Sequence, residues 1–221
     1  MSSAEENKLK SKELFTNSEG GVAYGFVLSY DFPWEAVPHI GELIRELIKT
    51  LPEGEYERRG EDVWISREAR VAGSADISGP TIIMANSEVR PGAFIRGSAL
   101  VGRGCVVGNS TELKNCILFD RVQVPHFNYV GDSILGYKAH LGAGVITSNV
   151  KCDKTPVSIR YGGGRIFTDL SKLGAIVGDG CEVGCNTVLN PGTVLGRGAI
   201  VYPLSSVRGY VEAGGRLKVE S

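Results

Sequence analysis

The chain has 221 residues, of which 42% are hydrophobic and 22% charged, and its formal net charge is −1. This balance is ordinary for a soluble globular protein and gives no electrostatic reason to expect binding to nucleic acid or to an anionic membrane. Five cysteines are an odd number, which argues against a disulfide framework, and with no apolar leader or membrane-length run we expect a cytoplasmic protein.

Residues 1–62 are predicted to be a polar segment that contains one amphipathic helix. Pro38 is placed to open this helix, and the helix would close before Pro52. Its apolar face follows the i, i+3, i+4, i+7, i+8 spacing and consists of Ile40, Leu43, Ile44, Leu47 and Ile48. We expect the helix to cap the open end of the repeat domain that follows, so that the hydrophobic interior does not end in water.

From residue 65 onward, aliphatic residues recur every six positions. The first run comprises Ile65, Val71, Ile77, Ile83, Val89, Ile95, Val101, Val107 and Leu113. The period then shortens by one residue twice, through Leu118, Val124, Val130, Leu135 and Leu141, and after a break it resumes as Val177, Val183, Leu189, Leu195, Val201 and Val207. Four residues after most of these positions stands a small side chain, such as Ala69, Cys105 or Cys181.

A period of six fits neither a helix of 3.6 residues per turn nor a strand of period two. It fits a short strand and a turn with one side chain pointing inward, and three such units make one coil of a parallel β-helix. The sequence therefore predicts an all-β fold in which residues 63–211 form a left-handed β-helix of hexapeptide repeats. Left-handed coils are an exception to the right-handed crossover rule. Residues 212–221 are expected to be a C-terminal tail.

The break in the repeat, residues 148–172, is rich in Lys, Asp and Gly. We predict an external loop or hairpin with "YGGGR" as its turn. Long excursions from a compact solenoid are more often functional than decorative, although a disordered surface insertion is the alternative.

Two columns of side chains on the predicted coils point to chemistry. Residues eighteen apart stack at about 4.8 Å, which would bring Arg96 next to Lys114, with Arg90 one corner earlier. These cations predict either a phosphate-binding surface or a solvated basic face. His126 would stack between Asn109 and Ala143 on the outside of the coil. There its imidazole is either a general base or an ordinary surface residue.

The segment "VGNSTELKNCILFDRVQVPHFNYVGDSILGYKAHLGAGVITSN", residues 107–149, carries a resemblance. Its "VGN…E.K", "H..Y.GD" and "GAG.I..N" elements resemble the acetyltransferase half of a bifunctional family, the glucosamine-1-phosphate acetyltransferases / N-acetylglucosamine-1-phosphate uridylyltransferases. Within that family the likeness is greatest to the archaeal-type sugar-1-phosphate enzymes. It covers roughly residues 63–211. No "GxGTR"-type nucleotide signature is present, so we do not expect the uridylyltransferase domain or its activity.

The resemblance implies an acetyl-CoA-dependent N-acetyltransferase that acts on an amino-sugar 1-phosphate. By resemblance His126 is the general base, assisted by Asn149. The implied sugar-phosphate residues are Arg90, Lys114, Tyr129 and His140, and the implied coenzyme residues are Ala143, Asn149, Cys185 and Pro203. His140, Cys185 and Pro203 depart from the residues usual in the family. The resemblance also implies a homotrimer whose active site lies in the groove between subunits, with no metal required for acetyl transfer.

Two alternatives remain at this point. The chain could be a non-catalytic trimeric scaffold or regulatory partner of a sugar nucleotidyltransferase, which the departures favour. It could instead be a sugar O-acetyltransferase that uses the same histidine. Hexapeptide coils also carry zinc enzymes, but these need three histidine ligands and only His126 and His140 lie in the predicted coil.

Overall fold

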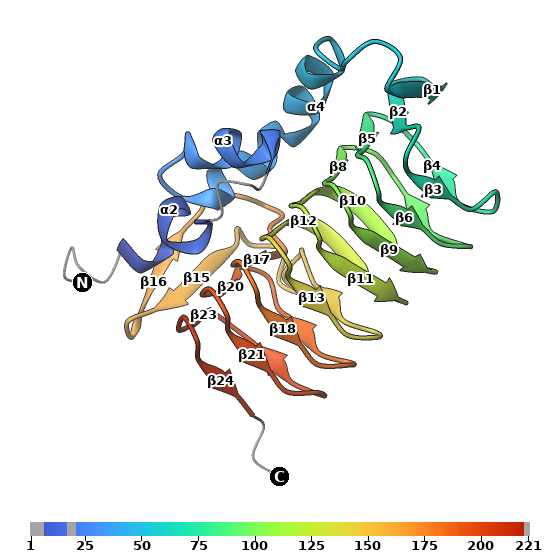
Figure 1. The fold of residues 1–221 in the computed structure, drawn as a ribbon. Helices are drawn as coiled ribbons and strands as arrows, with labels where there is room; N and C mark the ends of the chain where they lie inside the picture. Colours follow the sequence, from blue (N-terminus) through green and yellow to red (C-terminus); the bar gives the residue numbers. More distant parts are fainter. Residues whose placement is uncertain (1–6, 17–20, 219–221) are drawn as a thin grey trace.

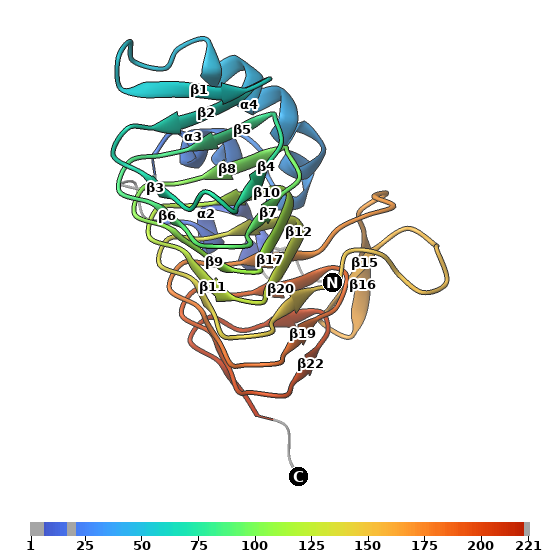
Figure 2. The ribbon, with the colours of Figure 1, turned by 90° about the vertical axis from the view of Figure 1, so that its right-hand side faces the viewer.

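The structure is a computed structural model that describes residues 7–16 and 21–218. Its main body is a stack of three-sided coils in which parallel strands pair with their counterparts one coil above and below (Figures 1 and 2). The prediction of an all-β chain built as a parallel β-solenoid is therefore confirmed. The left-handed sense of the coil stays a prediction.

Each coil contributes one strand to each of three faces. The first face consists of β2 (Val63–Ser66), β5 (Thr81–Ile83), β8 (Ala99–Val101), the second halves of β10 (Glu112–Leu118) and β12 (Tyr129–Leu135), β17 (Ala175–Val177), β20 (Thr193–Leu195) and β23 (Tyr210–Val211). The second face consists of β3 (Arg70–Val71), β6 (Glu88–Val89), β9 (Val106–Asn109), β11 (Gln123–His126), β13 (His140–Leu141), β18 (Glu182–Val183), β21 (Ile200–Val201) and β24 (Arg216–Leu217). The third face consists of β4 (Asp76–Ile77), β7 (Phe94–Ile95), the first halves of β10 and β12, β14 (Ile146–Thr147), β19 (Val188–Leu189) and β22 (Ser206–Val207).

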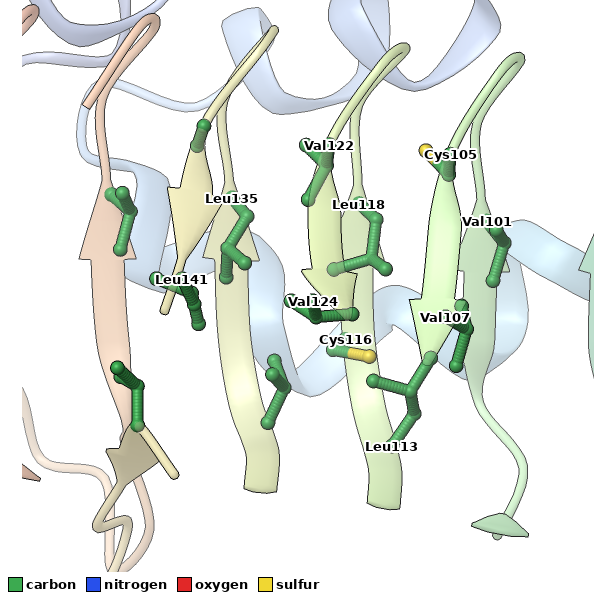
Figure 3. Close-up of a cluster of buried hydrophobic side chains, with 14 of the residues drawn as sticks. Val101, Cys105, Val107, Leu113, Cys116, Leu118, Val122, Val124, Leu135 and Leu141 are labelled. Carbon is green, nitrogen blue, oxygen red and sulfur yellow. The ribbon is translucent and has the colours of Figure 1, made fainter. Parts of the chain in front are cut away.

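The interior of the stack is the column that the six-residue period predicts (Figure 3). Every aliphatic position of the repeat belongs to this hydrophobic core, and only Val71 and Ile77 in the first coil are partly buried. Cys105 and Cys181 lie in the small inward slot of the repeat and are fully buried, as predicted. Stacking of like residues buries apolar area continuously along the axis and thereby stabilises coils that would not be stable singly.

The shortened period at Leu118 and Leu135 also has a structural cause. Strands β10 and β12 continue around the corner between the third and first faces, in register from Leu113↔Val130 to Leu118↔Leu135. At this corner Asn115 and Asp132 both have φ of 48°. Asn and Asp tolerate this left-handed conformation better than other residues with a side chain. The corner is therefore made with one residue fewer and with two polar side chains.

The N-terminal segment contains η1 (Asn7–Leu9), α2 (Ser11–Leu14), α3 (Val22–Leu28), η2 (Pro33–His39) and α4 (Ile40–Ile48), followed by β1 (Tyr56–Gly60). The predicted amphipathic helix is present as α4, with Ile40 and Ile44 fully buried. The prediction that it caps the first coil is wrong. Helix α4 packs on the side of the solenoid, against β5, β8 and β10 (Figure 1), and β1 instead pairs antiparallel with β2 at the end of the ladder.

An outward stripe of apolar residues on the first face explains this position. One residue per coil contributes to the stripe, which consists of Ile82, Leu100, Ile117, Ile134, Ile176 and Val194. All six are fully buried in a second hydrophobic core shared with the N-terminal segment. The helices therefore lie where they remove the most apolar surface from water. In the described ranges, no helix has the length and apolar character of a membrane span.

The break in the repeat is an antiparallel hairpin, β15 (Ser158–Tyr161) and β16 (Gly164–Phe167), that projects from the side of the stack (Figure 2). Gly162 and Gly163 form its turn, with φ of 55° and 76°, so the predicted hairpin and its turn are confirmed. At the other end of the chain, β24 continues the second face into the segment expected to be a tail. The rest of that segment, residues 219–221, lies outside the described residues, as do residues 1–6 and 17–20.

Candidate active site

The corner between the second and third faces carries a stacked column that we call the His126 corner. It comprises Asn109, His126, Ala143, Cys185 and Pro203. Main-chain hydrogen bonds link successive levels, from Phe127 N to Asn109 O (2.9 Å), Gly144 N to His126 O (3.0 Å), Asn186 N to Ala143 O (2.8 Å) and Leu204 N to Cys185 O (2.9 Å). The predicted stack of His126 between Asn109 and Ala143 is confirmed, and it places Cys185 and Pro203 in the same column.

A buried asparagine holds His126 in its outward position. The Asn128 carboxamide is 2% exposed; its oxygen accepts from His126 N (3.1 Å), and its nitrogen donates to Gly142 O (2.7 Å). Phe127, which lies between His126 and Asn128, has φ of 52° and is 60% exposed, so the chain bends sharply here. The His126 ring is exposed, and it forms no hydrogen bond or ion pair with a residue in the described part of the chain. The main chain of His126 is therefore held in place, and its imidazole is accessible to a ligand.

A second polar group, which we call the Asp132 cluster, lies at the corner between the third and first faces. It comprises Lys114, Asn115, Tyr129, Asp132 and Asn149. The Asp132 carboxylate is its centre: Lys114 Nζ donates to Oδ2 (3.3 Å), Asn115 Nδ2 to Oδ1 (2.9 Å), and Asn149 Nδ2 to Oδ2. Asp132 is 4% exposed, and a carboxylate buried to this extent needs such donors. The cluster is therefore a satisfied network on a rigid corner.

Tyr129 connects the two corners along the third face. Its side chain lies over Gly131, where an added Cβ would come within 2.4 Å of the tyrosine oxygen, and Asn149 Nδ2 donates to that oxygen (3.2 Å). Burial raises the pKa of the Tyr129 hydroxyl, and the nearby Asp132 and Glu112 carboxylates raise it further. The hydroxyl therefore keeps its proton and can donate it to an anion beyond the cluster.

The other predicted phosphate-binding cations lie apart from one another, and each has a carboxylate partner. Arg90 ends the second face and pairs with Glu88 at 3.3 Å. Arg96 stacks below Lys114 as predicted but pairs with Glu112 at 2.7 Å. Within one chain the cations thus form separate ion pairs, and Arg90 and Lys114 lie at different corners.

His140 lies on the second face, outside both the His126 corner and the Asp132 cluster. Its Nδ1 atom is 2.8 Å from the Glu182 carboxylate, one coil further along the same face. The predicted sugar-binding residue is therefore already paired with an acidic neighbour in this chain.

Three residues of this region were not singled out from the sequence: Asn115, Asn128 and Asp132. Asn115 and Asp132 occupy corners where other coils have glycine, at Gly97, Gly192 and Gly209. Asn128 occupies the small inward slot, four residues after Val124. A polar residue in either position is a readable signal, because the repeat alone would place glycine or a small residue there.

No group of three His, Cys, Asp or Glu side chains suited to a metal ion occurs among the residues that the structure describes. Cys181 is buried with its thiol directed at Gly196 O (3.1 Å), and Cys185 is exposed on the His126 corner. Their close spacing in sequence therefore reflects two different positions of the repeat.

The fold and these two corners define a parallel β-solenoid of the hexapeptide-repeat class. A family model described as the GMPPB C-terminal domain matches residues 77–161. The bifunctional protein GlmU of Methanococcus maripaludis is 36% identical over 111 residues, which are 50% of this chain and 27% of that protein. The bifunctional sugar-1-phosphate nucleotidylyltransferase/acetyltransferase of Sulfurisphaera tokodaii is 31% identical over 129 residues, or 58% of this chain and 32% of that protein.

These matches confirm the resemblance drawn from residues 107–149. The chain spans about a quarter to a third of the length of these curated relatives. Among solved structures, the acetyltransferase domain of PglB from Neisseria gonorrhoeae aligns with 79% of this chain and 65% of its own, at 16% identity and a TM-score of 0.35.

Proposed function

We propose that the chain is an acetyl-CoA-dependent N-acetyltransferase that acts on an amino-sugar 1-phosphate, of the glucosamine- or galactosamine-1-phosphate type. The observation that supports this most is the His126 corner, in which an exposed imidazole on a hydrogen-bonded main chain stacks directly below Ala143, Cys185 and Pro203. Sequence similarity to bifunctional sugar-1-phosphate acetyltransferases supports the same reaction.

In the proposed reaction the amine of the sugar attacks the thioester carbonyl of acetyl-CoA. A C–N bond forms, the C–S bond breaks, and coenzyme A leaves with its sulfur. His126 accepts the proton that the nitrogen loses, because the attacking amine must be neutral and the amide product does not keep that proton. The main-chain N–H of Ala143 is proposed to stabilise the negative charge that develops on the carbonyl oxygen, because the N–H groups of Gly142 and Gly144 already donate to Val183 O and His126 O.

Asn149 has a different role in this proposal from that of an oxyanion donor. Its amide nitrogen donates to Asp132 and to Tyr129, so both amide hydrogens are in use. We assign Asn149 as a positioning residue that fixes the Tyr129 hydroxyl. Its side-chain amide oxygen, Oδ1, is proposed to contact the coenzyme.

The sugar phosphate is proposed to bind Tyr129 and Lys114. The Tyr129 oxygen accepts a hydrogen bond from Asn149, so its O–H can donate a hydrogen bond to the phosphate. The Lys114 ammonium has three N–H donors, of which one is directed at Asp132. Arg90 and His140 would join them only across a subunit boundary. We therefore propose a homotrimer in the cytoplasm, in which the His126 corner of one subunit faces the Asp132 cluster of its neighbour.

An acceptor panel tests this function. Release of coenzyme A from acetyl-CoA is followed with glucosamine-1-phosphate, galactosamine-1-phosphate, the corresponding free amino sugars and simple sugars, and the products are identified by mass spectrometry. We expect N-acetylated sugar 1-phosphate and much slower reaction of the unphosphorylated amines. An O-acetylated product would replace the proposal with O-acetyl transfer.

A second candidate is the non-catalytic scaffold or regulatory partner. It is favoured by the carboxylate partners of Arg90, Lys114 and His140, which leave fewer free charges for a substrate. No turnover across the panel by a chain that remains an intact trimer would favour this candidate.

A further inference from the structure

The inserted hairpin makes a second candidate site, whose lining residues do not include His126. Two cavities flank it, of about 490 Å³ and 350 Å³, and both are lined by Arg160, Arg165 and Arg208. Arg160 and Arg165 lie on β15 and β16 of the hairpin, and Arg208 follows β22 at the end of the third face. Three arginines from two separate parts of the chain therefore line the same pair of cavities.

The hairpin is seated on the solenoid, so this convergence is built into the fold. Val157 and Ile159 are fully buried in the second hydrophobic core. Gly209, with φ of 76°, packs closely against β15: a Cβ added at this position would lie 2.4 Å from Arg160 O. A side chain at this corner would push the hairpin away, so the glycine lets Arg160 approach Arg208.

The charges at these cavities are unbalanced. Each cavity has four cationic side chains and a single carboxylate among its lining residues. The carboxylates are already paired, Glu212 with Lys8 and Asp153 with Lys151. Across the described ranges, none of the three arginines forms an ion pair with a carboxylate. Arg160 and Arg165 are also directly opposite in the hairpin register, and like charges in that position destabilise a sheet.

The surroundings suit a particular class of anion. Planar guanidinium groups bind phosphate oxygens in pairs of parallel hydrogen bonds. The larger cavity also contains Tyr161 and Tyr210, whose rings meet edge to face at 5.2 Å, and the side-chain-free turn Gly162–Gly163 at its rim. Its volume is in the range of small-molecule sites. Aromatic rings next to a phosphate-binding group are the elements that hold a nucleotide.

We propose that the diphosphate group of a nucleoside diphosphate binds between Arg160, Arg165 and Arg208, with its base against Tyr161 and Tyr210. Two sources share this chemistry: the nucleotide end of coenzyme A and a separate sugar nucleotide. The site does not depend on the activity proposed for His126, because its three arginines and two tyrosines are not among the residues assigned to that activity.

Equilibrium binding of UDP and ADP to the full chain, measured by calorimetry, tests the site. We expect both to bind, with affinity that falls as salt is added. Arg165→Gln and Arg208→Gln should each weaken binding about tenfold or more, the scale of one charge-assisted pair. Arg216→Gln is the matched control, since Arg216 is an exposed arginine of the same final coils on the second face, and it should bind as the wild type does. Thermal unfolding verifies that the exposed substitutions leave the fold intact.

Competition identifies the source. If coenzyme A displaces UDP and the arginine variants weaken both, the site holds the coenzyme; if UDP binds in the presence of saturating coenzyme A, it holds a separate nucleotide. Absence of UDP and ADP binding, or equal weakening by Arg216→Gln, would overturn the site. The His126→Gln variant should still bind UDP, so failure of the proposed acetyl transfer leaves this result distinguishable.

Discussion

At the scale of single residues, the Asp132 carboxylate organises more of the candidate site than any residue to which the sequence analysis gave a role. Its left-handed φ of 48° and its three donors occupy one corner. The motif "H..Y.GD" contains Asp132, but the periodicity alone cannot tell that the aspartate stacks on Asn115 and receives Lys114. Both contacts of Asp132 depend on β10 and β12 turning the corner with one residue fewer than the six-residue period predicts.

Substitution of Lys114 should expose this dependence. Lys114→Met leaves a nearly buried carboxylate with two amide donors, and we expect the free energy of unfolding to fall by about 1–3 kcal/mol. Asp132→Asn in the same background should recover part of that loss, because the amide carries no charge to solvate. Urea unfolding measures both variants. Lys49→Met is the control: its pair with Glu46 is exposed on both sides and should contribute less than about 1 kcal/mol.

The buried thiols give a pH-dependent stability. Burial raises the pKa of Cys181 to about 12, whereas a thiol in the unfolded chain ionises near about 8.5. The folded state therefore holds its proton where the unfolded state loses it, so this contribution is full below about pH 8.5 and declines as pH rises from there toward 12. Cys181→Ala should make the decline shallower in denaturant titrations between pH 8 and 10.5, and alanine fits the slot because Ala139 and Ala199 occupy it in neighbouring coils. An unchanged slope would show that Cys181 does not contribute.

At the scale of elements, the position of the N-terminal helices follows from the outward residues of one face. The residue before each inward aliphatic is apolar on the first face, as at Ile117 and Ile134. It is mostly polar on the second face, as at Glu88, and mixed on the third, as at Glu112 and Val188. This difference was present in the sequence. The six-residue period does not reveal this difference, because it follows only the inward aliphatic residue, which is the same on all three faces. The apolar face of α4 was predicted correctly, but the surface that it packs against is the first face and not the open end of the first coil.

Truncation on the covered face should therefore act as a core substitution. Ile117→Ala is expected to cost about 2–5 kcal/mol of unfolding free energy, although Ile117 points out of the solenoid. Val188→Ala provides the comparison, since Val188 is an outward residue of the third face and is 36% exposed; it should cost less than about 1 kcal/mol. Similar losses in the two variants would mean that the N-terminal segment does not cover the first face in solution.

At the scale of the whole molecule, the solenoid divides the proposed chemistry between two edges of the third face. The sequence could predict the core, the hairpin and the stack that carries His126, because each depends on residues a fixed number apart. It could not pair His140 with Glu182, because that relation depends on the register of the coils across the slips and the insertion. The column of the His126 corner, in contrast, is continuous across the insertion.

Thiol protection tests that column. Cys152 and Cys185 are the exposed cysteines and the other three are buried, so a thiol reagent should modify two of five thiols in the native chain. If the coenzyme lies on the His126 corner, saturating acetyl-CoA should slow modification of Cys185 about tenfold or more. Mass spectrometry of the cysteine peptides measures the modification. A ligand concentration of about 100 Kd is enough for such protection. Modification of Cys185 at an unchanged rate would place the coenzyme elsewhere.

The most direct measurement of the proposed catalysis is the rate of coenzyme A release with glucosamine-1-phosphate for His126→Gln beside His39→Gln. His39 is exposed before α4, next to Glu42 and Tyr30, and lies outside both corners. We predict that His126→Gln lowers kcat by about a hundredfold or more, the scale of general base catalysis, and that His39→Gln leaves it unchanged. Wild-type turnover by His126→Gln would contradict the assignment of the base.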